Sequence, residues 1–243
     1  MTDIATNLDT IDDSLSDIKT SIVNKGVTPS GNITTFATAI DNIPSGGGSS
    51  GKYQLLERVK DDNNNEIGTV SGFFTDANNV EYAVVCLDAQ YRLVDCYYCS
   101  NTNTAVTDLP VYATWAIWEA KETAMFNTQK ILDFCAANGY TSTACTHCRS
   151  KSFTIDGVTY YGQLPNIAEL VDICKNYTAI QSADTSVSQY SSLGFPRTLD
   201  RIWSSSQYSS SISWTVSNLG SANSGNKTSR YFVAPVLEIP NAV

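Results

Sequence analysis

The sequence predicts a helical N-terminal segment followed by a domain that mixes strands and helices. A regular apolar repeat at the start of the chain, a glycine- and serine-rich stretch, and strand and helix patterns after it support this organisation. The chain has 243 residues, enough for one medium-sized domain and an additional segment. We therefore expect a helical segment at 1–44, a linker at 45–51 and a folded domain at 52–243.

Isoleucine and leucine recur every three or four residues in the first segment, with polar residues between them. The members of this repeat are Ile4, Leu8, Ile11, Leu15, Ile18 and Ile22. Leucine at a and isoleucine at d favour a coiled coil of three or four helices. After Gly26 and Pro29, a second apolar pattern over 33–43 predicts a short helix. A helical hairpin within one chain is the alternative, but we expect a homo-trimer or homo-tetramer.

Strand patterns open the domain after the flexible linker SGGGSSG at 45–51. Alternation predicts a weak strand at 53–59 and a hairpin of 67–75 and 80–87 around a turn at 77–79. Later strand signals lie at Trp214 and Val216, and across 231–239.

Two helices are predicted in the middle of the domain. The first spans about 128–138 and stops at Gly139. The second begins near Pro165, where Asn166 and Glu169 have the spacing of a capping box. Its inner face would consist of Leu170, Ile173 and Cys174.

The composition limits the partners of the chain. Charged residues make up only 16% of it and the net charge is −9, which argues against nucleic acid or an anionic membrane as the partner. No apolar run approaches the ~20 residues that span a bilayer, so we expect no membrane insertion. No secretory signal is evident. A protein without such a signal that acts outside the cell would leave it by lysis or in a virion.

Cysteines are concentrated in the middle of the chain. They lie at 86, 96, 99, 135, 145, 148 and 174. Cys96 with Cys99 and Cys145 with Cys148 form CxxC pairs, and the single histidine, His147, lies inside the second pair. Two such pairs are typical of a structural zinc site, the one cofactor the sequence suggests. Disulfides formed after release and free thiols are the alternatives.

Three stretches carry a resemblance to a known family. They are GQLPNIAEL at 162–170, IWSSSQY at 202–208 with WTV at 214–216, and NK at 226–227 with YFVAPV at 231–236. Their order and spacing resemble C-type lectin-fold domains of the formylglycine-generating-enzyme type. Within that group the chain looks most like variable proteins of diversity-generating retroelements and related phage tail proteins. The resemblance covers most of 52–243, and the region 18–43 also looks like the N-terminal segments of phage tail and fibre proteins. It implies that 1–44 is an oligomerisation or tail-attachment segment and that 52–243 is a ligand-binding domain.

The resemblance implies an α+β fold: two helices on a small twisted antiparallel sheet, with long loops. Its C-terminal strands would present the binding face. Alternation along the strand then places Thr215 and Ser217 outward. The residues assigned to the core are Trp203, Trp214, Val216, Val233 and Val236.

The segment 204–231 is dominated by serine, asparagine, tyrosine, threonine and glycine, the residue types that antibody paratopes favour. The retroelement mechanism mutates template adenines, and this mixture is compatible with it. An ordinary solvated loop is the alternative. Tyr208 and Tyr231 would be hot spots, or half-buried packing residues, an alternative that is stronger for Tyr231. The predicted ligand-binding residues are Tyr208, Ser209, Ser211, Ser213, Thr215, Ser217, Asn218, Asn223, Asn226, Arg230 and Tyr231.

We do not expect an enzyme. The sequence contains no GxSxG, phosphate-loop or HExxH motif. The formylglycine-generating relatives depend on cysteines in the C-terminal part of the domain, and no cysteine follows Cys174 here. Calcium-dependent lectins need Glu-Pro-Asn and Trp-Asn-Asp motifs, and here Trp214 is followed by Thr215 and Val216.

We therefore expect a phage-associated receptor-binding protein or adhesin that is made in the bacterial cytoplasm and carried on the virion. Its partners would be a host cell-surface protein or glycan and a phage tail component. One rival is a structural tail or baseplate component that binds no ligand. The other is a redox or metal enzyme that uses the CxxC pairs.

Overall fold

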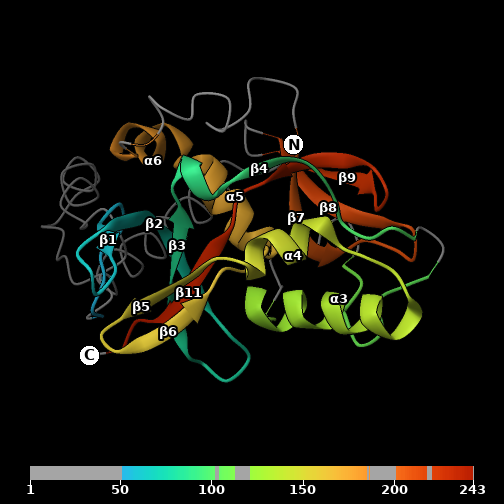
Figure 1. The fold of residues 1–243 in the computed structure, drawn as a ribbon, viewed down its shortest axis with the longest axis horizontal. Helices are drawn as coiled ribbons and strands as arrows, with labels where there is room; N and C mark the ends of the chain where they lie inside the picture. The colour runs from blue at the N-terminus through green and yellow to red at the C-terminus, as the bar shows by residue number, and fades with distance from the viewer. Residues whose placement is uncertain are drawn as a thin grey trace, which may run out of the picture. The chain divides into compact units, whose positions relative to one another are not determined.

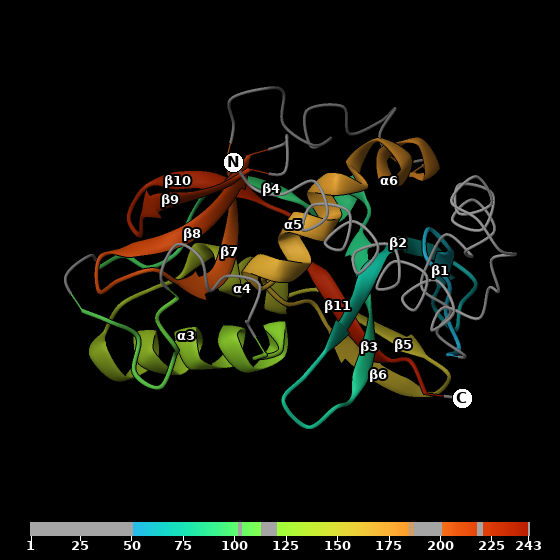
Figure 2. The same ribbon diagram turned by 180° about the vertical axis from the view of Figure 1, so that it is seen from behind.

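The computed structural model describes residues 51–101, 104–112, 121–184, 186, 201–217 and 221–242. The predictions for the N-terminal segment at 1–44, for most of the linker and for Asn218 lie outside the described residues. From Gly51 onward the chain forms one compact unit (Figures 1 and 2).

The first sheet is antiparallel and contains the predicted hairpin. Its strands, in spatial order, are β1 (Arg58–Lys60), β2 (Glu66–Thr75), β3 (Glu81–Leu87) and β11 (Val236–Pro240). The β2–β3 turn forms because the Asp76 carboxylate accepts hydrogen bonds from the N–H groups of Asn78 and Val80, and Asn79 adopts φ 60°. Of the strand predicted at 53–59, only the end is realised, as β1.

The second sheet is built mainly from the C-terminal part of the chain. In spatial order it comprises β4 (Leu93–Tyr97), β10 (Arg230–Val233), β7 (Arg201–Gln207), β8 (Ile212–Ser217) and β9 (Ala222–Asn226). The β10–β7 pair is parallel. The strand signal at 231–239 is divided between the two sheets, because the chain passes from β10 to β11 at Ala234 and Pro235, and proline cannot donate to a ladder.

Both predicted helices are confirmed. They are α3 (Ala124–Asn138) and α5 (Ile167–Lys175). Two shorter helices, α4 (Thr143–Arg149) and α6 (Tyr177–Ala183), follow them. Helix α3 begins earlier than predicted because the Thr123 hydroxyl caps it, and it ends at Gly139 in the left-handed conformation. Helix α5 begins with the complete capping box of Asn166 and Glu169. The remaining elements are η1 (Ala89–Tyr91) and the hairpin of β5 (Ser152–Ile155) and β6 (Val158–Tyr161).

The two sheets share α5 as a common packing element. Helix α5 contacts β2 of the first sheet and β7 and β8 of the second, and it lies between the sheets in both views (Figures 1 and 2). Its predicted inner face is buried. On the other face of the second sheet, α3 packs against β7. The second sheet is therefore covered on both faces.

The fold is α+β, as predicted, but it is larger than the resemblance implies. The described residues form four α-helices rather than two. One strand pair is parallel, so the second sheet is not purely antiparallel. The short helix α4 was missed because its sequence, TACTHCR, has no clear apolar period, although Ser142 caps it with its side chain.

Candidate functional site

Two turns of the second sheet are joined by a buried lysine. Lys227 is fully buried. Its backbone N–H donates to the Ser211 carbonyl at 3.1 Å, and its ammonium donates to the Ser210 carbonyl at 2.9 Å and to Gln207 Oε1 at 2.7 Å. We call the residues of the β7–β8 and β9–β10 turns, 208–211 and 226–230, the two-turn surface. Because Lys227 belongs to the second turn and donates to the first, the backbone of this surface is held as one unit.

Gln207 extends this framework to a third segment. Its side-chain oxygen also accepts from the Val106 N–H at 2.8 Å, and its side-chain nitrogen donates to the Leu109 carbonyl at 3.4 Å. The Lys227 ammonium reaches the Thr104 carbonyl of the same segment at 3.4 Å. Lys227 and Gln207 therefore connect 104–109 to the two-turn surface.

Most of the predicted ligand-binding side chains around these turns are accessible. Asn226 and Arg230 are exposed, and Tyr208, Ser209 and Ser211 are half-buried. Two exposed members, Ser210 and Thr228, were not predicted. Their position in the same turns as predicted residues was the signal that could have found them.

The prediction was wrong for Ser213 and Thr215, which are both fully buried. Alternation along β8 does place them opposite Trp214 and Val216, but the opposite face is not solvent. Thr215 pairs with Trp203 on β7. A Cβ atom added at Gly225 would lie 3.3 Å from Thr215 Cγ2 and 3.3 Å from the Trp203 ring. The face of β8 that carries Ser213 and Thr215 is therefore covered by the part of the core around Trp203, not by solvent.

The two predicted hot-spot tyrosines are half-buried. The Tyr208 ring packs edge-on against Trp214, with centroids 5.1 Å apart. The Tyr231 ring lies 4.7 Å from the Trp203 ring, and the Arg201 guanidinium lies 5.7 Å from its centroid. Both rings are therefore held by the core, and Tyr231 is in the packing environment that the alternative prediction described.

Ser217 and Asn223 lie away from the two turns. Ser217 ends β8 and Asn223 lies on the edge strand β9, where it is paired with Thr215. Both side chains are half-buried. The structure therefore divides the predicted residues that it describes into the turn group, Tyr231 on β10, these two outlying positions and the buried pair.

The cysteines of both CxxC motifs lie in one apolar cluster. Cys96, Cys99, Cys145 and Cys148 pack there together with Cys135, and all seven cysteines are free thiols. Burial raises the pKa of Cys96 to about 11 and that of Cys145 to about 12.

No group of three or more histidine, cysteine or acidic residues among the described ranges is arranged to hold a metal ion. The His147 ring is directed to the Tyr91 carbonyl, with Nε2 at 2.7 Å, and burial lowers the pKa of this histidine. The thiols do not converge as a zinc site requires. Structural zinc stays a prediction from the sequence alone.

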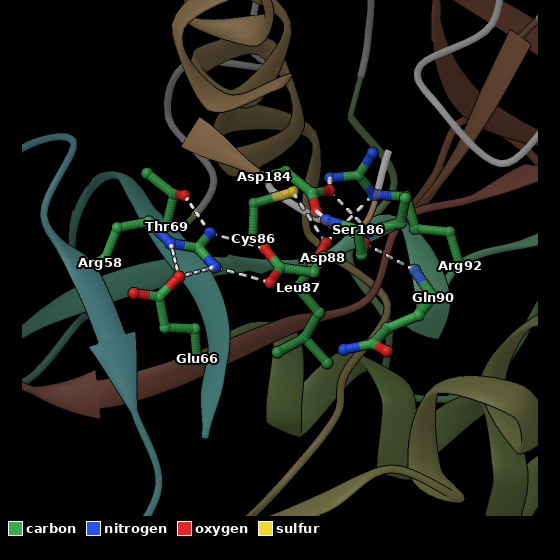
Figure 3. A network of polar contacts seen from close by, with 11 residues as sticks. Arg58, Glu66, Thr69, Cys86, Leu87, Asp88, Gln90, Arg92, Asp184 and Ser186 are labelled. Carbon is green, nitrogen blue, oxygen red and sulfur yellow. Dashed lines mark hydrogen bonds and ion pairs between the residues drawn. The ribbon is translucent and has the colours of Figure 1, made fainter. Parts of the chain in front are cut away.

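A second polar cluster is an ionic network that joins β1 and β2 to the segment that follows β3 (Figure 3). Arg58 binds both Asp88 carboxylate oxygens at 2.7 Å. Arg92 and Asp184 form a fully buried ion pair with Nη2–Oδ2 3.3 Å, and the Ala89 N–H donates to the same Asp184 oxygen at 2.7 Å. Burial raises the pKa of Asp88, and Arg58 opposes that rise. Because these groups bind one another, the network serves to connect chain segments.

A pair of buried carboxyl groups lies at the start of α3. Glu238 accepts hydrogen bonds from the N–H groups of Ala124 and Met125 at 2.7 and 2.8 Å, where the helix dipole favours an ionised carboxylate. Burial, followed by the neighbouring Glu238 charge, raises the pKa of Glu169 well above its ordinary value. The cavity beside Glu169 has a volume of about 20 Å³, which suits a single water molecule rather than a substrate.

The raised pKa of Glu169 predicts how stability changes with pH. A carboxyl group whose folded-state pKa is raised stabilises the fold fully below its unfolded-state pKa, and this contribution is lost as pH rises through the folded value. We expect the unfolding free energy of the wild type to fall as pH rises above the ordinary glutamate value of 4.5. Glu169→Gln, which mimics the protonated group, should reduce that slope in urea titrations over a pH series.

Exposed Glu57 provides the matched control, because Glu57→Gln removes a carboxyl group of the same kind from the surface. Its pH slope should equal that of the wild type. Equal slopes in Glu169→Gln and the wild type would show that Glu169 is not protonated in the fold.

Comparisons of the chain with protein-family models, curated protein sequences and solved structures gave no match. No helix in the described part of the chain has the length and apolar character needed to cross a bilayer. The functional argument therefore depends on the site itself.

Proposed function

We propose that this chain is a non-catalytic adhesin, or receptor-binding protein, of a phage tail, whose C-type lectin-type domain presents a diversifiable surface to its ligand. The observation that carries the proposal is the two-turn surface. Accessible tyrosine, serine, asparagine, threonine and arginine side chains project from a backbone that the buried Lys227 holds in place. A surface of this kind can change its side chains without changing its scaffold.

The residue types of this surface suit recognition. Tyrosine offers a large contact area at a small cost in conformational entropy, and serine and asparagine offer adaptable hydrogen bonds. Tyr208 is already restrained by Trp214, so it loses little freedom on binding. Exposed Arg230 adds a cation and planar hydrogen-bond donors.

The positions of the motif residues support the same family. Trp203, Trp214 and Val216 are buried, as the resemblance implies for its core. The WSS stretch forms β7 beside β8, and the LPxxxEL stretch starts α5 with its capping box. These local agreements favour the C-type lectin-type proposal over an unrelated α+β fold.

The proposed ligand is a protein or glycan on the host cell surface. The net charge of −9 disfavours anionic polymers. The heptad pattern at 4–22 would assemble three or four copies on the phage tail, and several weak sites on one particle would bind with avidity.

Charge substitutions on the two-turn surface test the proposal. The triple variant Ser210→Glu, Asn226→Glu and Thr228→Glu changes exposed residues only. It should reduce adsorption of the oligomer to host cells at least about tenfold, because the new carboxylates would be buried in the complex without partners. Adsorption is measured with labelled protein on a panel of bacterial strains.

The matched control is Ser152→Glu, Val158→Glu and Thr159→Glu, which adds the same charge to exposed positions of the β5–β6 hairpin. It should adsorb like the wild type. Equal adsorption of both triple variants and the wild type would contradict the proposal and favour a structural tail component.

The proposed diversification has its own test. A near-copy of the codons for 200–239, differing at adenines, should lie beside a reverse transcriptase gene.

A further inference from the structure

Two cysteines that belong to different elements lie within reach of each other. The Sγ atoms of Cys99, which follows β4, and Cys135, on α3, are 3.7 Å apart. Thirty-six positions separate them along the chain, and they are not partners in either CxxC motif. This distance exceeds the ~2.05 Å of a disulfide bond, so the two sulfurs are neighbours that are not bonded to each other.

The buried ammonium of Lys227 lies near this pair. Its hydrogen-bond acceptors are neutral oxygens: Gln207 Oε1 and the carbonyls of Ser210 and Thr104. No ion pair found among the described residues includes Lys227. A buried ammonium is costly without an anion. Burial lowers the pKa of Lys227 to about 8, and negative charge on the Cys99–Cys135 pair opposes that effect.

The two thiols differ in acidity. A hydrogen bond from Cys135 lowers the pKa of Cys99 to about 6, and the Lys227 charge contributes in the same direction. The same interaction raises the pKa of Cys135. Cys99 is therefore the more acidic thiol of the pair and Cys135 the hydrogen-bond donor. This asymmetry is typical of a dithiol with one attacking and one resolving sulfur.

We propose that Cys99 and Cys135, which are both buried, form a redox-active dithiol, which a small-molecule disulfide such as glutathione disulfide converts to an intramolecular disulfide when local opening of the fold exposes the Cys99 sulfur. The Cys99 thiolate attacks one glutathione sulfur, forms a mixed disulfide and releases one glutathione thiolate. Cys135 then loses its proton and attacks the Cys99 sulfur, which forms the Cys99–Cys135 bond and releases the second glutathione thiolate. Two electrons pass from the cysteine pair to glutathione.

Oxidation would act on the framework of the two-turn surface. The disulfide removes the Cys99 thiolate and leaves the Lys227 ammonium without its anionic neighbour. The Lys227 carbonyl also accepts the Cys99 N–H at 3.1 Å, so the pair and the turn are directly connected. The new bond would at the same time restrain the chain between β4 and α3.

The experiment incubates the full chain, after removal of metal with a chelator, in buffers of increasing glutathione disulfide. The free-thiol count should fall from seven to five, return to seven with a dithiol reductant, and be accompanied by a rise of several degrees in Tm for the oxidised form. Cleavage by chymotrypsin after Tyr98, Tyr112, Phe134 and Tyr140 places Cys99 and Cys135 in the separate peptides 99–112 and 135–140, each with a single cysteine. Mass spectrometry should find these two peptides linked.

Variants locate the reaction. Cys99→Ser and Cys135→Ser should each abolish the linked peptide. Cys174→Ser, which removes a buried thiol from a different apolar cluster, should retain it. Retention of all seven thiols by the folded wild type, or a link within a CxxC motif, would overturn the proposal. One equivalent of tightly bound zinc, measured before the chelator treatment and lost in Cys99→Ser, would also overturn it and assign these sulfurs to a metal.

Discussion

Replacing Trp203 by alanine is expected to lower the free energy of unfolding by about 3–5 kcal/mol. The side chain is fully buried in the layer between the second sheet and the α3 side of the domain. Its ring packs against Tyr98 and Tyr231, with centroids 5.8 and 4.7 Å apart. The cavity left by alanine would therefore remove contacts to several elements at once. Urea titration of the wild type and the variant measures the difference.

Trp203→Phe provides the graded control. It keeps an aromatic ring but removes Nε1, which donates to the Cys96 carbonyl at 2.8 Å. We expect a loss of about 1–3 kcal/mol, because a buried acceptor is left without its donor. A loss below about 1 kcal/mol for the alanine variant would contradict the assignment of Trp203 to the centre of this layer.

Asp184→Ala is expected to destabilise the fold by about 3–5 kcal/mol, because it leaves the buried Arg92 guanidinium without its carboxylate. Both side chains of this ion pair are fully buried. Asp184 also accepts the Ala89 N–H and binds the backbone and hydroxyl of Ser186. The loss therefore combines the removal of the partner in a buried ion pair with unsatisfied backbone donors, and urea titration would measure it.

The double variant Arg92→Met with Asp184→Ala separates these two contributions. Removing both charges should recover part of the lost stability, since an apolar pair avoids the desolvation of buried ions. The exposed pair of Lys175 and Asp172, with a distance of 2.9 Å, serves for comparison, and Lys175→Ala should change stability by less than about 1 kcal/mol. If the double variant is no more stable than Asp184→Ala, the charge is not the cause.

Elements with strong local signals could be predicted from the sequence. The capping box of Asn166 and Glu169 located the start of α5, and Gly139 located the end of α3. The turn predicted at 77–79 located the β2–β3 hairpin. In each case the deciding interaction lies within a few residues of the signal, so no distant part of the chain was needed.

Elements that depend on distant partners were missed or only partly predicted. Strand β7 contains three consecutive buried serines, 204–206, which have no apolar alternation. They are stabilised by contacts with other elements: the Ser205 N–H donates to the Pro165 carbonyl at 2.7 Å, and the Ile167 N–H donates to the Ser206 hydroxyl at 3.0 Å. Such hydrogen bonds leave no pattern in the strand itself.

The sequence by itself determined the mixture of strands and helices, the main helix ends, the β2–β3 hairpin and the concentration of serine, tyrosine and asparagine near the C-terminus, because these depend on short-range chemistry. Only the tertiary structure decided that Ser213 and Thr215 are buried while Ser210 and Thr228 are accessible. Only it brought Cys99 to Cys135 and placed Lys227 beneath the two turns. The physical reason is that alternation tells which side chains share a face, whereas the layer that packs on each face comes from residues far away in the chain.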